Sequence, residues 1–176
     1  MAKGGKERLG DRLRVAPGAT VDLDRVDAGE THGWAEESAA AQQAEHEAHL
    51  TELQERLWAE GKQRLLIVLQ GIDAAGKDGT IRHVMDAFNP QGCSVVGFKA
   101  PSAVEIAHDY LWRVHQHTPG NGHITIFNRS HYEDLLVVRV HDLVPKSVWS
   151  RRYRHINEWE RMLTDDEVIK AKTEPP

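Results

Sequence analysis

Cysteine is nearly absent from this sequence of 176 residues: Cys93 is the only one, so no disulfide can form within the chain. Such low usage is typical of a reducing compartment. No apolar run reaches the roughly 20 residues that a membrane-spanning helix needs. The charged segment 1–14 is followed by no apolar stretch, so it does not resemble a secretory signal. We therefore expect a cytoplasmic protein with no membrane partner.

A basic excess is missing as well. The chain has 22 Lys and Arg against 27 Asp and Glu, which gives a formal net charge of -5. A general nucleic-acid-binding protein needs a basic surface, so this composition argues against a nucleic-acid partner. It does not argue against a smaller polyanionic substrate, because such a substrate needs only a local group of Lys and Arg side chains.

Metal-binding patterns of Cys and His are also missing. His108, His115 and His117 lie close together in the sequence, but no Cys partner and no H-E-x-x-H pattern accompanies them. We therefore predict surface or packing roles for these histidines rather than metal binding. Cys93, between a turn and a strand, is predicted to be a small buried apolar residue.

What the sequence does contain is a regular alternation of apolar runs and helical periodicity. A hydrophobic fraction of 40% over this length indicates one domain with an apolar core. The expected strands cover 65–69, 94–98 and 123–127; the expected helices cover 35–60, 81–88, 102–116, 132–140 and 147–163, with Ser147 as the N-cap of the last. This alternation predicts an α/β domain with a mainly parallel sheet flanked by helices. Residues 1–33 lack periodicity and predict an irregular arm, so the domain is expected over 34–163.

The loop between strand 65–69 and helix 81–88 reads GIDAAGKD. It satisfies the G-x-x-x-x-G-K pattern of a phosphate-binding P-loop, in the strand–loop–helix context that the pattern requires. The glycines let backbone N–H groups surround a phosphate, the helix N-terminus adds positive potential, and Lys77 adds a full charge. The residues predicted to bind phosphate are Gly71, Ala74, Ala75, Gly76, Lys77, Asp78 and Gly79. The alternative is a glycine-rich turn that binds no phosphate.

Two carboxylates distinguish this loop from the common P-loop. Asp78 stands where Ser or Thr would bind Mg²⁺, and Asp73 lies inside the loop. Two carboxylates repel a phosphate unless a cation bridges them, so Asp73 is the candidate Mg²⁺ ligand. The alternative for Asp73 is a residue that only forms the turn. The alternative for Asp78 is a negative charge that stabilises the first turn of the helix.

The third strand ends in the segment FNRSHYED. Because ligands of parallel sheets bind at the carboxyl ends of strands, Asn128 and Arg129 are expected to face the P-loop. Arg129 can contact phosphoryl oxygens through two nitrogens and stabilise the transferred charge, which makes it a candidate catalytic residue with Asp73 and Lys77. The alternative is a surface ion pair of Arg129 with an acid of the same segment. Lys99, near the end of the second strand, is a weaker substrate candidate whose alternative is a plain surface lysine.

Together, the segments GIDAAGKDGTIRH, FKAPS, HDYLWR, IFNRSHYEDLLVVRVH and INEWERML resemble the polyphosphate kinase type-2 family over about residues 40–163. The resemblance implies a P-loop NTPase-like fold and transfer of a phosphoryl group between inorganic polyphosphate and a nucleotide, with Mg²⁺ or Mn²⁺. The Walker A positions of the family fall on Asp73, Gly76 and Lys77, and its Walker B segment falls on Asn128 and Arg129.

The resemblance also suggests a subclass and a mechanism. Asn128 with Glu133 nearby is similar to the branch that phosphorylates both nucleoside monophosphates and diphosphates, here AMP and ADP or GMP and GDP. The implied mechanism is direct in-line transfer, in which positioning and charge neutralisation do most of the work. The basic side chains of the last predicted helix either extend the anion track or form a solvated face; they are Arg151, Arg152, Arg154 and Arg161. Homo-oligomers are expected for full-length family members.

The resemblance ends before residue 164. Family members continue with another strand, a basic lid helix and further helices, whereas 164–176 reads as a divergent polar tail. We therefore expect a truncated or frame-shifted chain, a sheet that is incomplete at the C-terminus, an exposed apolar edge at Leu65–Leu69, and weak or absent kinase activity.

Other functions are open at this point. An ATP-dependent nucleoside monophosphate kinase is one alternative, although its loop usually carries an extra glycine and a Thr-type Mg²⁺ ligand. A phosphate-binding fragment without catalysis is the other. A GTPase is disfavoured because the chain contains no N-K-x-D motif.

Overall fold

The computed structural model describes residues 9–27, 29–166 and 168–173. The chain divides into two compact units, one of residues 1–44 with Pro176 and the other of residues 45–175. The described part of the first unit holds α1 (Leu9–Arg12), the short 3-10 helix η1 (Leu23–Arg25) and the beginning of α2 (Glu36–Glu60). None of its described residues is buried. All of the described residues that are buried belong to the second unit.

The second unit alternates strands with helices, as the sequence predicts. After α2 follow β1 (Arg64–Leu69), α3 (Lys77–Met85), η2 (Pro90–Gly92), β2 (Cys93–Gly97), α4 (Ala103–Ile106), α5 (Trp112–His115), β3 (Ile124–Asn128), α6 (Glu133–Val140), α7 (Lys146–Asp165) and β4 (Val168–Thr173). The α/β fold is confirmed. Of the described helices, none is long and apolar enough to cross a membrane.

The four strands form one parallel sheet in the order β2-β3-β1-β4. In the register of the sheet, Leu69 at the end of β1 lies opposite Asn128 at the end of β3, and Asn128 lies opposite Gly97 at the end of β2. The three strands therefore end level with one another. The loops that follow them meet at one edge of the sheet, where parallel sheets bind their ligands.

The prediction that β1 forms an exposed edge of the sheet is wrong. β4 pairs with β1 in parallel from Arg64 opposite Val168 to Leu69 opposite Thr173, so β1 is an inner strand. The segment expected to be a polar tail thus contains a strand over Val168–Thr173. Its sequence, VIKAKT, has no clear alternation of apolar and polar residues. Pairing with the apolar strand β1 stabilises a strand that the local sequence does not predict.

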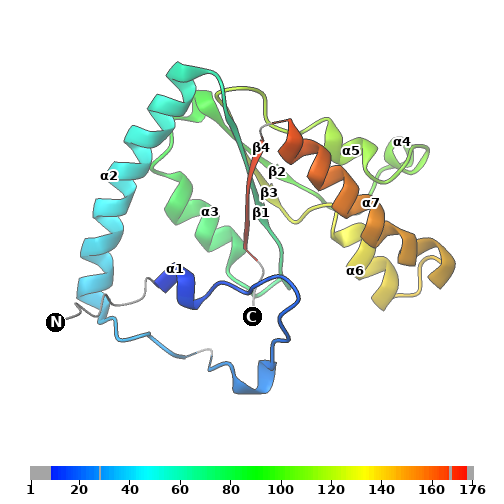
Figure 1. Cartoon of the computed structure of the whole chain (residues 1–176), viewed down its shortest axis with the longest axis horizontal. Helices are drawn as coiled ribbons and strands as arrows, with labels where there is room; N and C mark the ends of the chain where they lie inside the picture. The colour runs from blue at the N-terminus through cyan, green and yellow to red at the C-terminus, as the bar shows by residue number, and fades with distance from the viewer. Residues whose placement is uncertain (1–8, 28, 167, 174–176) are drawn as a thin grey trace. The chain divides into compact units, whose positions relative to one another are not determined.

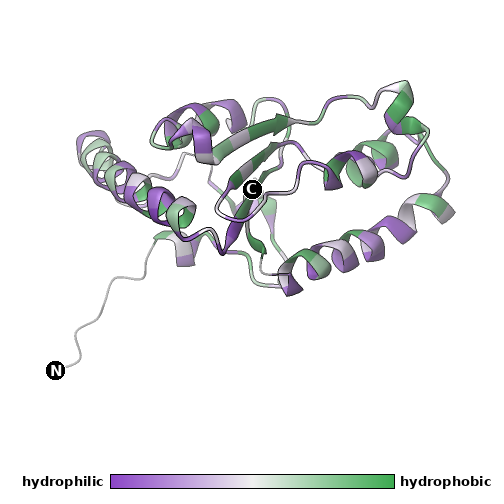
Figure 2. Ribbon diagram, turned by 90° about the horizontal axis from the view of Figure 1, so that it is seen from above, coloured by the Kyte–Doolittle hydropathy of each residue, from purple (hydrophilic) through white to green (hydrophobic). Residues whose placement is uncertain are grey.

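Two apolar layers cover the two faces of the sheet. Leu66 and Val68 point into a core with Phe127, Trp159 and Leu163, on the side of α5 and α7. On the opposite face, another cluster packs towards α2 and α3: it consists of Leu69, Ile124 and Ile126 with Leu57, Leu65, Ile67, Ile81, Met85, Phe88 and Cys93. Figure 1 shows α3 on one side of the sheet and α5, α6 and α7 on the other, and Figure 2 shows hydrophobic segments gathered at the strands.

Two helix predictions need correction. Residues 102–116 form two short helices instead of one. Ser102 and Glu105 make a capping box that begins α4, and Asp109 then accepts hydrogen bonds from the N–H groups of Leu111 and Trp112 at 3.0 and 3.1 Å, which breaks the helix. α7 begins at Lys146, with Pro145 rather than Ser147 at its N-cap.

Candidate active site

The P-loop connects β1 to α3 and closes around Lys77. Gly76 adopts φ +78°, a left-handed conformation that favours glycine, and α3 begins at the next residue. Lys77 is buried, with only 8% of its surface exposed. Its Nζ donates hydrogen bonds to the carbonyl oxygens of Gly71 at 2.9 Å and Ile72 at 2.6 Å. The ammonium group is therefore held inside the loop that the sequence predicts to bind phosphate.

Arg129 follows β3 directly and reaches the same loop. Its backbone has φ +64°, and its N–H donates to the carbonyl oxygen of Leu69 at 3.0 Å. Its guanidinium pairs with the carboxylate of Asp73 and lies 3.5 Å from an oxygen of Glu133. The structure thus brings Asp73 and Arg129 together across 56 residues of sequence. The predicted alternative, an ion pair of Arg129 within its own segment, is present at the same time.

Asp78 and Asn128 form a second link between the P-loop helix and β3. Asn128 Nδ2 donates to Oδ1 of Asp78 at 2.7 Å. Asp78 is the second residue of α3, where a carboxylate stabilises the positive end of the helix. Lys99 lies two residues beyond β2, at the same edge of the sheet, and its side chain is exposed.

Sequence reasoning missed Gln70. This side chain stands between β1 and the P-loop, where its Nε2 donates to Glu133 and its Oε1 accepts a hydrogen bond from Ser130 Oγ at 3.1 Å. Ser130 is fully buried and also accepts the N–H of Tyr132 at 3.2 Å. Gln70 therefore ties the segment that carries Arg129 to the P-loop strand. Its position immediately after a buried strand was the available signal.

A pocket of about 750 Å³ opens beside these residues. The polar side of its wall is formed by Gln70, Gly71, Asp73, Arg129 and Glu133, and the remaining lining is formed by Ile72, Tyr132, Leu135, Leu136, Val137, Val140, His141 and Tyr153. Half of this second group belongs to α6. The volume is in the range of pockets that bind small molecules. A pocket with one charged and one apolar side suits a ligand with an anionic end and a flat apolar part.

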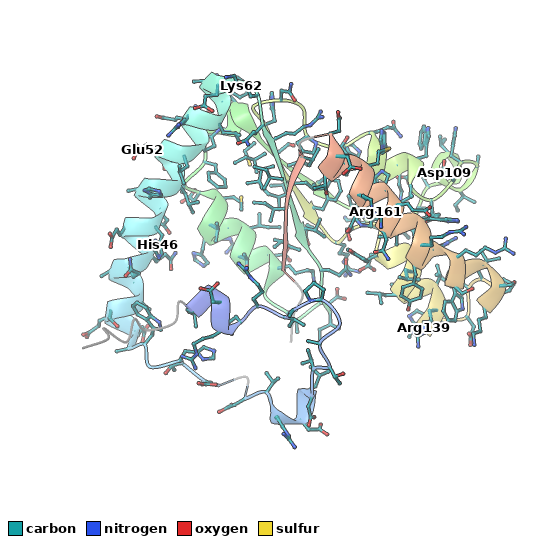
Figure 3. The ribbon with its side chains drawn as sticks, viewed as in Figure 1. His46, Glu52, Lys62, Asp109, Arg139 and Arg161 are labelled. Carbon is teal, nitrogen blue, oxygen red and sulfur yellow. The ribbon has the colours of Figure 1, made fainter. Side chains whose placement is uncertain are left out.

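The basic side chains of α7 serve different purposes. Arg152 donates to the backbone carbonyl of Asp134 and lies over the ring of Tyr110, 4.4 Å from its centroid. Burial raises the pKa of Tyr110 to about 12. Arg154 pairs with Glu158 at 3.7 Å, and both side chains are largely exposed. Arg161 lies further along α7, towards its C-terminal end (Figure 3). For Arg154, the ion pair favours the solvated face over an anion track.

Three carboxylates lie at the P-loop edge of the sheet. Asp73 and Glu133 pair with Arg129, and Asp78 accepts a hydrogen bond from Asn128. Among the described residues, no group of three or more His, Cys, Asp or Glu side chains is placed to hold a metal by itself. Carboxylate oxygens nevertheless fit Mg²⁺, which usually takes one or two carboxylates and completes its coordination with water and phosphate oxygens. Asp73, 86% exposed, is accessible for this purpose.

Two of the histidines for which the sequence predicts surface or packing roles contact aromatic side chains. His108 stacks on Trp112 with 4.0 Å between ring centroids. His115 Nδ1 accepts a hydrogen bond from Trp159 Nε1 at 3.0 Å. Cys93 is half-buried in the second apolar layer rather than fully buried, and burial raises the pKa of its thiol.

A parallel sheet, a lysine-containing loop between its inner strand and a helix, and a level edge of strand ends define an α/β domain of the P-loop kinase class. A family model described as Polyphosphate kinase 2 (PPK2) matches residues 34–173. The chain belongs to this family.

Individual relatives agree with this assignment. The chain is 51% identical over 157 residues to a protein of Meiothermus ruber named AMP/ADP-polyphosphate phosphotransferase, a match that covers 88% of this chain and 59% of the relative. It is 48% identical over 126 residues to the ADP-polyphosphate phosphotransferase of Rhodopseudomonas palustris, covering 65% of this chain and 44% of the relative.

Among solved structures, polyphosphate kinase 2 from Arthrobacter aurescens TC1 matches with a TM-score of 0.84 and 40% identity, over 92% of this chain and 58% of the other. The chain thus spans about three-fifths of the length of the Meiothermus ruber relative and of the Arthrobacter aurescens structure.

Proposed function

We propose that this chain carries the catalytic core of a polyphosphate-dependent nucleotide kinase. The reaction moves a phosphoryl group between inorganic polyphosphate and AMP or ADP, or GMP or GDP. The observation that carries the proposal is that Lys77 and Arg129 each contact the P-loop, and that Arg129 lines a pocket with an apolar side. The names of the relatives from Meiothermus ruber and Rhodopseudomonas palustris support polyphosphate with AMP and ADP as the substrates.

In this proposal the P-loop and Arg129 hold phosphate. Backbone N–H groups at the start of α3 and the Lys77 ammonium bind phosphoryl oxygens, which replace the loop carbonyls of Gly71 and Ile72 as partners of Nζ. The planar guanidinium of Arg129 contacts two oxygens of the same or the next phosphate. Catalysis then follows from alignment of donor and acceptor and from neutralisation of the transferred charge.

A divalent cation, Mg²⁺ or Mn²⁺, belongs to the proposal because the carboxylates of Asp73, Asp78 and Glu133 would repel a bound phosphate unless a cation bridges them. Binding of phosphate at Arg129 frees the carboxylate of Asp73, which becomes available as an oxygen ligand. When bound, the cation neutralises charge on the phosphoryl group and makes it a better electrophile.

The apolar side of the pocket is assigned to the acceptor nucleotide. Leu135, Val137 and Tyr132 offer surface for a nucleoside, and Glu133 lies at the border between the polar and apolar sides. A nucleoside in this position directs its phosphate towards Arg129. Acceptance of both mono- and diphosphates, proposed from Asn128 and Glu133, requires only that the polar side has room for one further phosphate.

The test is formation of ATP from polyphosphate, Mg²⁺ and either ADP or AMP, followed with luciferase. We expect Lys77→Ala to lower turnover by about 10²-fold or more. Lys62→Ala is the matched control, since Lys62 is exposed and precedes β1 at the opposite edge of the sheet (Figure 3). A second assay uses ATP in place of polyphosphate as the phosphoryl donor and AMP as the acceptor. Transfer from ATP but not from polyphosphate would indicate the ATP-dependent kinase instead.

Binding of polyphosphate that depends on Lys77, without turnover, would instead support a phosphate-binding fragment. If Lys77→Ala binds polyphosphate and turns over as the wild type does, the proposed site is refuted. The shorter length of this chain relative to its relatives makes the binding measurement as necessary as the turnover assay.

A further inference from the structure

The segment that carries Arg129 is held from its other side by a buried carboxylate of α7. Glu160 is 6% exposed, and its Oε1 accepts a hydrogen bond from the hydroxyl of Tyr132 at 2.6 Å. The same oxygen lies 3.2 Å from Nε2 of His131, which is completely buried. The His131 ring packs against the rings of Trp159 and Tyr132, with 4.8 and 4.5 Å between centroids. One oxygen of α7 thus contacts two consecutive residues of the site segment.

Burial of a carboxylate costs folding free energy unless polar partners surround it, so the contacts of Glu160 with His131 and Tyr132 stabilise the fold. Glu160 lies 28 and 29 residues beyond the two side chains it contacts, so the contact exists only in the folded chain. α7 is a helix of 20 residues whose buried face joins the core through Ile156, Trp159 and Leu163. It is therefore a rigid support for whatever Glu160 holds.

Arg129 needs such support. A non-glycine residue with φ near +64° is in a strained conformation that persists only where neighbouring contacts fix it. The backbone bond to Leu69 fixes one side of the turn, and the contact of Ser130 with Gln70 fixes a second. The next two residues, His131 and Tyr132, are the ones that Glu160 holds.

We propose that Glu160 is a positioning residue for Arg129. By fixing His131 and Tyr132, it maintains the backbone turn that directs the guanidinium to the mouth of the pocket. This inference rests on the proposed role of Arg129 in phosphate binding. Glu160 does not itself line the pocket; it acts on the site through His131 and through Tyr132, which does line it.

The experiment measures binding of tripolyphosphate with Mg²⁺ by calorimetry. Glu160→Met removes the acceptor at similar side-chain length, and we expect it to weaken affinity about 10- to 100-fold. Glu160→Gln keeps an oxygen at the same position and should restore most of the affinity. Glu158→Met is the matched control on the same helix, because Glu158 is 56% exposed, and it should bind like the wild type.

A double-mutant cycle separates positioning from general destabilisation. In an Arg129→Ala background, Glu160→Met should change affinity by no more than about twofold, because the group that it positions is gone. An effect of full size in that background would overturn the proposal, as would wild-type affinity in Glu160→Met.

Amide hydrogen exchange across residues 129–133 gives a readout that does not depend on the ligand. We expect faster exchange in Glu160→Met than in the wild type or in Glu158→Met; unchanged exchange would overturn the proposal. If the wild type does not bind tripolyphosphate, the proposed function fails while exchange still decides the positioning role. If Glu160→Met does not fold, Tyr132→Phe, which removes one of the two contacts, is measured by exchange with the same expectation.

Discussion

Replacing Arg129 with glycine or alanine separates the contribution of its backbone from that of its guanidinium. Both substitutions remove the pairs with Asp73 and Glu133, which are partly exposed and stabilise the fold by less than about 1 kcal/mol. Only glycine adopts φ +64° without strain. The two variants therefore lose the same contacts but differ in backbone energy.

The size of that difference can be estimated. A left-handed conformation costs an L-residue roughly 1–2 kcal/mol, and glycine avoids this strain. Glycine also loses about 0.5–1 kcal/mol more conformational entropy on folding, which offsets part of the advantage. We expect Arg129→Gly to be more stable than Arg129→Ala by about 1 kcal/mol. In a chain of this length, that difference is roughly 2–4 °C in Tm.

The assay pairs thermal unfolding with tripolyphosphate binding and, where turnover is measurable, with ATP formation. We expect both variants to lose turnover by about 10²- to 10³-fold, since each lacks the guanidinium. Equal or greater stability of Arg129→Ala would refute the left-handed backbone. Retained binding in either variant would refute the role of the guanidinium.

Three further predictions concern the fold. Leu66→Ala, at a fully buried position, should lower the free energy of unfolding by about 2–5 kcal/mol in urea denaturation; Val95→Ala, 49% exposed, should change it by no more than about 0.5 kcal/mol, and equal effects would contradict the assigned core. Asp134→Ala removes the carboxylate 3.0 Å from the buried guanidinium of Arg113, leaves it with the more distant Glu105 at 4.0 Å, and should lower the free energy of unfolding by about 3–5 kcal/mol. Replacing both members with apolar residues should cost less in the same assay, and an equal cost would contradict a buried pair. Burial raises the pKa of Tyr110 to about 12, whereas an unfolded tyrosine ionises near 10, so the stability linked to Tyr110 is complete below about pH 10 and is lost as pH rises towards 12. Tyr110→Phe should remove that part of the loss of stability at alkaline pH. A phenolate titration in which no tyrosine has a pKa above the ordinary value of about 10 would contradict this prediction.

Part of the candidate site follows from consecutive residues. The P-loop is a local signal, because one strand, one turn and one helix N-terminus place Lys77 without help from distant segments. Arg129 follows from the rule that parallel strands end at a common edge, and the register of Leu69 opposite Asn128 agrees with it. The break within 102–116 also had a local signal, Asp109, whose side chain accepts hydrogen bonds from the N–H groups of Leu111 and Trp112 and which the helical periodicity concealed.

Other parts depend on partners far away in the chain. Gln70 is marked in the sequence only by its position directly after β1, and its contacts with the site segment form because Ser130 and Glu133 fold against it. Glu160 reads as an ordinary acid on an amphipathic helix, yet burial against His131 and Tyr132 makes it part of the support of the site.

The sequence by itself determined the α/β class, the P-loop motif and the family, because periodicity and short motifs depend on neighbouring residues. Only the tertiary structure decided that Val168–Thr173 is a strand beside β1, that Asp73 meets Arg129, and that Arg129 takes a left-handed backbone. Each of these outcomes is set by contacts between segments distant in sequence. Local propensity is too weak to fix them, whereas packing and buried hydrogen bonds in the folded chain are strong enough to override it.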